Sequence, residues 1–424
     1  SLDQLALYDA LTPLRGNVTG SAVIDEGSIV DLDPVAAGAD TASIDNGDSP
    51  FFPAAGPPPQ RLASNFLIMN SAASVTNNTL AVMGPQLGYF YPEIVMQIHL
   101  SGPGIEAQGA AVPGLAMYML IGRTENYAWS LPVRAPGLDR RLPTWGTGDY
   151  EWQGFLEQSE HPHAADGPSG RLLNWNNQAA PGFMHGDDRP YGSVQRIEMF
   201  DKFPDQVDLA GVVSIMNRAA TEVVRSPVWP VVSEVLRGGE APSPLAAEVV
   251  DLLDAWVADD APRLDADDDG FFDEAGPTIM DALFGPLATE VMRPVFGDYT
   301  AALNEIRDLG GDHDEESGSV RSPPGASFVD KDLRTLLGQE VQGKFNLSYC
   351  GNGSLEDCRD SLWRVVDEVA QELAAERGND PSTWLRESWR VGFEPGLIPE
   401  TIRATNRPTF QQVLEFVPSG NDGQ

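Results

Sequence analysis

The stretch Ala63-Ser64-Asn65-Phe66-Leu67-Ile68-Met69 is followed, after a polar hairpin, by the run from Leu80 to Tyr89, LAVMGPQLGY. Four consecutive apolar residues directly after a Ser-Asn pair, with three prolines upstream at 57–59, predict a buried strand that starts abruptly. The second run contains Gly84-Pro85-Gln86, which predicts a turn that returns a polar side chain towards the start of the first strand. The fold is therefore expected to be organised around Ser64.

The chain from Ser64 to Trp129 has the pattern of strands throughout. Glu93 to Leu100 alternates between apolar and other residues, and Leu115 to Ile121 is almost wholly apolar, as expected of a strand covered on both faces. A sheet buried on both sides requires further layers above and below it.

A set of short motifs accompanies the serine. They are Ser64-Asn65, Gly84-Pro85-Gln86, LSGPG from Leu100 to Gly104, Gly109, Pro113-Gly114 and Ala128-Trp129-Ser130. With these motifs the chain resembles the catalytic heavy chain of the penicillin acylase family of N-terminal-nucleophile hydrolases. The resemblance implies an α/β (α+β) fold, a four-layer αββα sandwich of the N-terminal-nucleophile hydrolase type with added helical segments.

Ser64 is the nucleophile that this resemblance implies. In the family the precursor cleaves its own backbone before the serine, here between Ala63 and Ser64, so that one residue carries both the hydroxyl and a free α-amine. A terminal amine has a pKa near ~8 and can accept the hydroxyl proton, so no histidine is needed. The resemblance also implies that Gln86 orients the terminal residue and that Leu87 lines the acyl pocket. The alternative is that Ser64 merely leads into a core strand.

The resemblance breaks after Ser130 and resumes further on. Family members continue from this point with a long segment of strands and helices, whereas this chain runs into Leu131 to Asp139. Family motifs return at Arg141-Leu142-Pro143, Gly146-Thr147-Gly148 and Tyr150-Glu151-Trp152. An interior segment is therefore expected to be missing after Ser130.

Asn174-Trp175-Asn176-Asn177 is the second stretch where chemistry is expected. By the family pattern, the amide of Asn176 donates to the oxygen that becomes negative when the serine attacks an amide carbonyl. A neutral donor stabilises this charge without binding the ground state as strongly as a cation would. The alternative is a polar turn, because asparagine-rich loops are common.

The chain is strongly acidic, with 27 basic and 63 acidic residues, a net charge of −36 and a pI near 4.2. This balance argues against nucleic acids and anionic membranes as partners, and no apolar run reaches the ~18 residues of a membrane span. Residues 1–63 are expected to be a light-chain remnant followed by a spacer or linker. Residues 64–424 are expected to form the acylase heavy-chain catalytic domain, with a helical region over residues 197–310.

Both cysteines lie close together, at Cys350 and Cys358, on either side of a glycine-rich stretch. An even count in a short loop predicts a local disulfide and an oxidising compartment, so the protein is expected to be extracellular or periplasmic. The alternative is a pair of reduced, buried thiols.

An acidic loop follows Arg263, with the sequence RLDADDDGFFD. Alternate carboxylates followed by Gly270 copy the first half of a calcium loop, in which positions one, three and five supply oxygens and glycine makes the sharp turn. The candidate ligands are Asp265, Asp267, Asp269 and Asp273. The bidentate glutamate of the twelfth position is replaced by Gly276, so a structural calcium site and a merely acidic loop both remain open.

Three helices are predicted from the later sequence. Leu209 to Ala220 and Leu245 to Val257 carry apolar residues at helical spacing and are expected to pack on the sheet. Ser354 opens a third helix, with Asp357 as the acid of a capping box and Gly378 after its end.

The resemblance implies a secreted amidohydrolase that cleaves a linear amide between an apolar acyl group and an amine. Penicillins, acyl-homoserine lactones and acylated peptides all present such an amide, and the sequence does not choose among them. A light chain is a further expected partner, and no organic cofactor is expected. The alternative is a catalytically impaired remnant that acts as a calcium-stabilised structural or binding protein.

Overall fold

The computed structural model describes a large part of the chain. The described residues are 63–86, 95–113, 119–130, 157, 159, 163–165, 169–177, 196–200, 204–304, 325–388, 390–391, 401–403 and 410–417. The predicted spacer and light-chain remnant before Ala63 therefore lie outside the described residues.

The first sheet contains the strand that begins at the Ser-Asn pair. Its order is β10-β2-β1-β7, and every neighbouring pair is antiparallel. The strands are β1 (Ala63–Met69), β2 (Thr79–Gln86), β7 (Arg171–Asn174) and β10 (Gln412–Phe416). A short 3-10 turn, η2 (Ser71–Ala73), follows β1 and is capped by the Asn70 side chain. The strand predicted from the sequence at Ser64 is confirmed.

The second sheet is an antiparallel meander in the order β3-β4-β5-β6. Its strands are β3 (Met96–Gly102), β4 (Ile105–Ala111), β5 (Ile121–Arg123) and β6 (Ala128–Trp129). Ala128 of β6 packs against a cluster of the first sheet that includes Met83 and Leu414. Gln412 of β10 also donates from Nε2 to the carbonyl of Gly122 at 3.2 Å. The two sheets are therefore stacked.

Helices cover the opposite face of the first sheet. Side chains of a strand alternate between its two faces, and Leu67 and Met69 of β1 are fully buried together with Val212 and Met216. These last two residues belong to α4 (Leu209–Thr221), which is capped by Asp208, and η4 (Arg196–Phe200) completes the layer. Helix, sheet and sheet thus form successive layers, which confirms a mixed α/β class. In the part of the chain that the structure describes, most of β3 is exposed.

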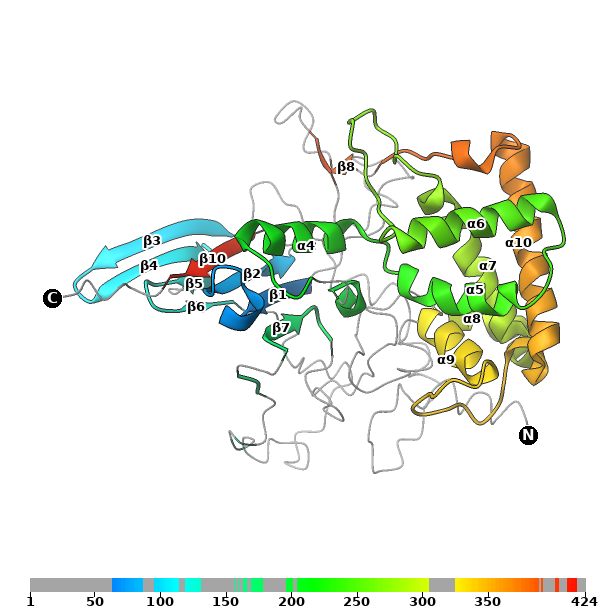
Figure 1. Ribbon diagram of the computed structural model, residues 1–424, viewed down its shortest axis with the longest axis horizontal. Helices are drawn as coiled ribbons and strands as arrows, with labels where there is room; N and C mark the ends of the chain where they lie inside the picture. Colours follow the sequence, from blue (N-terminus) through cyan, green and yellow to red (C-terminus); the bar gives the residue numbers. More distant parts are fainter. Residues whose placement is uncertain are drawn as a thin grey trace, which may run out of the picture.

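The remaining helices lie at the other end of the molecule from the sheets (Figure 1). They are α5 (Trp229–Arg237), α6 (Pro244–Ala258), α7 (Gly276–Phe296), α8 (Thr300–Asn304), α9 (Ala326–Leu336) and α10 (Leu355–Arg377). Short 3-10 turns join them: η5 (Ser226–Val228), η6 (Gly297–Tyr299), η7 (Cys350–Gly353) and η8 (Pro381–Thr383). A small ladder of β8 (Arg390–Val391) and β9 (Ile402–Arg403) follows. Among the described helices, none combines the length and the apolar character of a membrane span.

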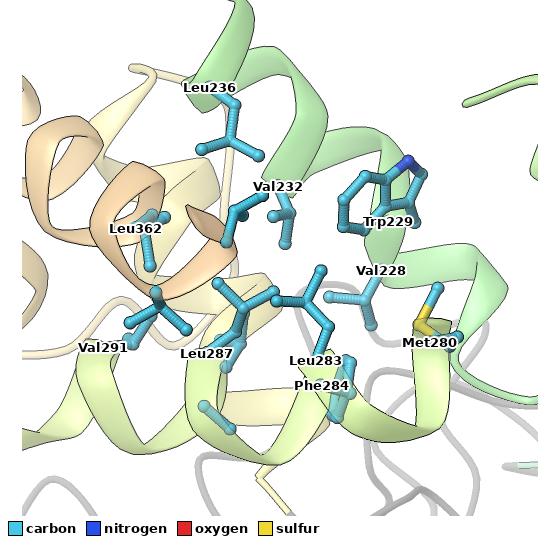
Figure 2. Packing of buried hydrophobic residues seen from close by; sticks show 14 of the residues in the cluster. Val228, Trp229, Val232, Leu236, Met280, Leu283, Phe284, Leu287, Val291 and Leu362 are labelled. Atoms are coloured by element: carbon cyan, nitrogen blue, oxygen red, sulfur yellow. The ribbon is translucent and has the colours of Figure 1, made fainter. Parts of the chain in front are cut away.

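These helices share one apolar core. Val232 and Leu236 of α5 face Leu283 and Leu287 of α7, and Leu362 of α10 closes the cluster (Figure 2). Each of these side chains is at most 2% exposed, so each contributes about 1.5–3 kcal/mol through burial.

The sequence predicted that the helix from Leu245 to Val257 packs on the sheet, and this is wrong. The helix forms as α6, but its buried residues Val249, Val250 and Leu253 join the helical core instead. Apolar residues at helical spacing show that one face is buried, but they do not show which element covers that face.

A disulfide joins Cys350 to Cys358, as the sequence predicted. Ser354 caps α10 by accepting from the backbone N–H of Asp357 at 3.2 Å, so the predicted start of this helix is confirmed. A buried carboxylate supports the same turn, because Asp332 of α9 accepts from the backbone N–H groups of Tyr349 (3.0 Å) and Cys350 (2.8 Å).

Candidate active site

The start of β1 lies against the end of β2. In the antiparallel register Ala63 is opposite Gln86, Ser64 is opposite Pro85, and Asn65 is opposite Gly84. The chain thus brings the three residues of the predicted cleavage and orienting machinery, Ala63, Ser64 and Gln86, to one place at the end of the sheet.

The predicted turn at Gly84-Pro85-Gln86 is wrong, because these residues are the last three of β2. The hairpin between β1 and β2 already reverses the chain, so no second turn is needed to return Gln86 to the serine. A proline is tolerated at this point because the ladder between β10 and β2 ends at Met83, two residues before Pro85.

On the other side of β1, the strand β7 ends at Asn174, which lies opposite Phe66. The paired residues of an antiparallel ladder move in opposite directions along the two chains. Ser64 lies two residues before Phe66, and Asn176 lies two residues after Asn174, in the turn that follows β7. The predicted nucleophile and the predicted oxyanion donor thus belong to segments at the same end of this ladder.

The segment after β7 forms a tight polar turn. Asn176 has a φ of 66°, in the left-handed region that asparagine tolerates. Its backbone N–H donates to Asn174 Oδ1 at 3.1 Å, and the N–H of Trp175 donates to Asn177 Oδ1 at 3.0 Å. The predicted polar turn and the predicted donor are therefore compatible, because the flanking asparagines build the turn and leave the Asn176 side chain for another role.

An aromatic contact fixes this turn to the helical layer. Trp175 is fully buried, and its ring centroid lies 4.9 Å from that of Phe200 in η4. Such a contact adds about 0.5–1.5 kcal/mol beyond area burial. The position of Asn176 next to β1 is therefore set by a rigid anchor one residue away.

Two buried amides near Ser64 have polar atoms without hydrogen-bond partners among the described residues. Both amide atoms of Asn65 and the Oδ1 atom of Asn176 are buried in this way, and the two residues are 0% and 8% exposed. An unsatisfied buried polar group costs about 1–3 kcal/mol. Such groups are uncommon in stable cores, and their presence beside Ser64 suits a site that binds a polar ligand group.

The sequence analysis gave Asn65 no role of its own. The available signal was a polar residue on the same strand face as Leu67 and Met69, both of which are fully buried. Leu87, the predicted residue of the acyl pocket, lies outside the described residues.

The predicted metal ligands lie in the loop between α6 and α7, at the helical end of the molecule. Asp265, Asp267 and Asp269 each place a carboxylate oxygen so that all three oxygens lie within 4.8 Å of one another. Asp273 is outside this group of three and accepts from the backbone N–H of Ala266. The neighbouring Asp268 turns to Arg390, whose guanidinium holds the pKa of Asp268 below its ordinary value.

Comparison with known proteins identifies the group to which this arrangement belongs. The sequence model of the family described as "Penicillin amidase" matches residues 7–133 and 130–395. The chain belongs to the penicillin amidase family. The junction of the two matched stretches coincides with the position at which the sequence predicts a missing interior segment.

Penicillin G acylase of Escherichia coli is a distant relative in this family, with 23% identity over 318 residues. The alignment covers 69% of this chain and 35% of that protein, so the chain spans about a third of its relative's length. A solved structure, the thermostable penicillin G acylase from Alcaligenes faecalis in its orthorhombic form, has a TM-score of 0.64 at 15% identity, covering 84% of this chain and 88% of that one. The chain therefore has the N-terminal-nucleophile hydrolase fold of the penicillin acylases, as predicted.

Proposed function

We propose that this penicillin amidase family member is an amidohydrolase that cleaves a linear amide between an apolar acyl group and an amine, with Ser64 as its nucleophile. The observation that supports the proposal is that Ser64 and Asn176 adjoin the same end of the β1–β7 ladder, Ser64 in β1 and Asn176 in the turn after β7. A nucleophile and a neutral hydrogen-bond donor at one end of a sheet are the parts that amide attack needs.

Maturation would use the same hydroxyl. The Ser64 oxygen attacks the Ala63 carbonyl, the C–N bond breaks and a C–O bond forms, so the amide becomes an ester and the Ser64 amine is released. Water then hydrolyses the ester and leaves Ser64 as a new amino terminus. The small side chain of Ala63 suits the tight geometry of this step, and the bond lies at the first residue pair of β1.

In the mature protein, Ser64 would carry both the nucleophile and the base. Its α-amine, with a pKa near ~8, takes the hydroxyl proton as the oxygen attacks the substrate carbonyl. The Asn176 amide donates to the developing oxyanion, and Gln86, opposite Ala63 on β2, orients the terminal residue. The amine product leaves with the proton, and water then hydrolyses the acyl ester, so the chemistry needs no organic cofactor.

The substrate class follows from the family and the acyl pocket that Leu87 would line. Penicillins, acyl-homoserine lactones and acylated peptides all offer an apolar acyl group on a linear amide. Both relatives named above are penicillin G acylases, which favours a penicillin among these substrates. A light chain would complete the enzyme, and an extracellular or periplasmic location suits the disulfide between Cys350 and Cys358.

The junction of the two matched stretches at residues 130–133 favours a second candidate. Relatives provide a second, backbone oxyanion donor just past the strand that contains Trp129. Loss of one such donor typically lowers kcat by about 10²–10³-fold. If the missing segment carried that donor, the chain would be a catalytically impaired remnant that acts as a structural or binding protein.

A kinetic assay of the 424-residue chain separates the two candidates. The substrates are a phenylacetyl anilide, benzylpenicillin and a long-chain acyl-homoserine lactone. The proposed hydrolase gives a kcat/KM of about 10⁴ M⁻¹s⁻¹ or more on at least one of them, and Ser64→Ala abolishes it. Ser71→Ala, which removes an exposed hydroxyl on η2, is the matched control and retains full activity. Wild-type chain without turnover on all three substrates favours the remnant.

A further inference from the structure

In the acidic loop from Asp265 to Asp273, three carboxylates converge on one point, whereas that of Asp268 points to arginine side chains. Asp265, Asp267 and Asp269 converge, with one oxygen of each within 4.8 Å of the others. Asp268 has a φ of 63° and turns away to Arg390 (2.7 Å) and Arg403 (3.4 Å). Since alternate positions one, three and five supply the first oxygens of a calcium loop, the folded loop has the arrangement that its spacing predicted.

A buried, unpaired oxygen points to a ligand independently of this clustering. Asp265 is only 2% exposed, and its Oδ2 accepts from the Ser388 hydroxyl at 2.6 Å. Its Oδ1 is buried and has no hydrogen-bond partner among the described residues. A buried carboxylate oxygen without a donor is costly, whereas a bound cation would satisfy it.

The neighbouring arginine does not supply that cation. Arg390 Nη1 lies 3.6 Å from Asp265 Oδ2, but its closest contact is the 2.7 Å ion pair with Asp268. Three converging carboxylates repel one another at such distances. A divalent cation with oxygen ligands offsets this repulsion at the point where the three oxygens meet.

The chemical nature of the three ligands indicates which metal ion would bind. The group contains only carboxylates, which suit hard cations such as Ca²⁺ and Mg²⁺ rather than zinc. Two of the three ligands are exposed on a turn that contains Gly270, whose φ is 94°. Such a loop favours Ca²⁺, because Mg²⁺ requires near-ideal octahedral geometry.

The loop is also the attachment point of a later segment of the chain. The backbone N–H of Phe272 donates to Arg386 O at 2.9 Å, and the N–H of Ser388 donates to Gly270 O at 2.8 Å. The side chains of Ser388 and Arg390 bind Asp265 and Asp268 as described above. This segment leads through β8 and β9 towards β10, the strand of the first sheet that pairs with β2.

We propose that Asp265, Asp267 and Asp269 form a structural Ca²⁺ site that fastens residues 386–388 and Arg390 to the loop before α7. The twelfth position, Gly276, cannot carry the bidentate glutamate of a complete loop, because a Cβ there would lie 2.2 Å from the Trp256 ring. Calcium binding is therefore weaker than in a complete calcium loop, with a Kd of about 10⁻⁴ M.

Calorimetric titration of the full chain tests the site. The protein is first freed of metal with a chelator and then titrated with CaCl2 and, in parallel, with MgCl2. The expected result is one Ca²⁺ per chain, a higher Tm with calcium, and weaker binding of Mg²⁺. Absence of both binding heat and a Tm shift at millimolar CaCl2 overturns the proposal.

Two neighbouring variants make the test specific. Asp267→Asn and Asp268→Asn each remove one exposed negative charge from the loop, but only Asp267 belongs to the converging group. Asp267→Asn should weaken Ca²⁺ binding at least tenfold, whereas Asp268→Asn should change it less than threefold. Equal weakening in both variants would show attraction to diffuse negative charge and would overturn the site.

Hydrogen exchange tests the fastening of the later segment. The amides of Phe272 and Ser388, which join the loop to residues 386–388, should exchange more slowly when Ca²⁺ is added to the wild-type chain. Asp267→Asn should show no such protection. Calcium binding without slower exchange at these two amides would contradict the proposed role.

Discussion

Asn174 of β7 lies directly opposite Phe66 of β1. Each functional residue lies two residues from this pair: Ser64 precedes Phe66 by two positions, and Asn176 follows Asn174 by two positions. The two residues therefore lie at the same end of this ladder, with Asn176 in the turn after β7 and Ser64 in β1. Strand pairing, not proximity in sequence, brings the two segments together.

Replacement of Asn176 by alanine should lower kcat by about 10²–10³-fold, because the variant loses one oxyanion donor. The measurement is steady-state kinetics on the best amide substrate, together with thermal unfolding. Asn77→Ala is the matched control, since Asn77 also has a positive φ (56°) but is exposed in the β1–β2 hairpin. Equal loss of activity in both variants would assign the effect to backbone strain and not to the donor.

Asp332 should make stability depend on pH. Burial raises its pKa from 3.8 to about 6, although the N–H groups of Cys350 and Tyr349 act in the opposite direction. Because the folded value is the higher one, the stability from this group is fully present below pH 3.8 and is lost as the pH rises through about 6. The loss amounts to about 3 kcal/mol.

Urea unfolding across this pH window, for the wild type and for Asp332→Asn, is the measurement. Asparagine does not titrate, so the difference in unfolding free energy between the two proteins should fall as the pH rises. A difference that stays constant across the window would show that the pKa of Asp332 is not raised in the folded chain.

Gly351 should tolerate no side chain. It has a φ of 58°, and a Cβ at this position would lie 2.3 Å from the backbone nitrogen of Cys358. Gly338 also has a positive φ (75°), but a Cβ there would meet nothing within 4 Å. Gly338→Ala should therefore lower the free energy of unfolding only by the cost of a left-handed backbone conformation, about 1–2 kcal/mol. Gly351→Ala should lower it clearly more, as measured by chemical unfolding. Equal costs would show that the turn at η7 can move away from α10.

The sequence predicted the helices and strands that have a regular apolar pattern and a clear start or end signal. The strand at Ser64 and the helix after Ser354 were found because an apolar run follows a polar pair in one case and a cap precedes a helix in the other. The helix α7 lies inside the helical region predicted over residues 197–310, but its bounds were not predicted, although it is 21 residues long and central to the helical core. Pro286 and Pro294 lie inside it, and prolines normally indicate helix ends.

The sequence predicted which residues belong to the candidate site, but it did not predict how they are arranged in space. The family motifs indicated Ser64 and Asn176, yet only the pairing of β1 with β7 shows that their segments meet at one end of the sheet. The role of Gly84-Pro85-Gln86 was misread, because a proline near the end of a strand looks like a turn when the neighbouring ladder is not known. In the acidic loop, the sequence could not show that Asp268 turns to Arg390 while Asp265 stays buried.

Intact-mass spectrometry of the purified protein tests the central claim most directly. The account predicts two fragments whose masses sum to that of the chain plus one water, with Ser64 as the new amino terminus of the larger fragment. Ser64→Ala should give a single uncut chain without amidase activity, and Ser64→Cys should still be cut at the same bond. A Ser64→Ala protein that is cleaved between positions 63 and 64, or that still hydrolyses amides, would contradict the account.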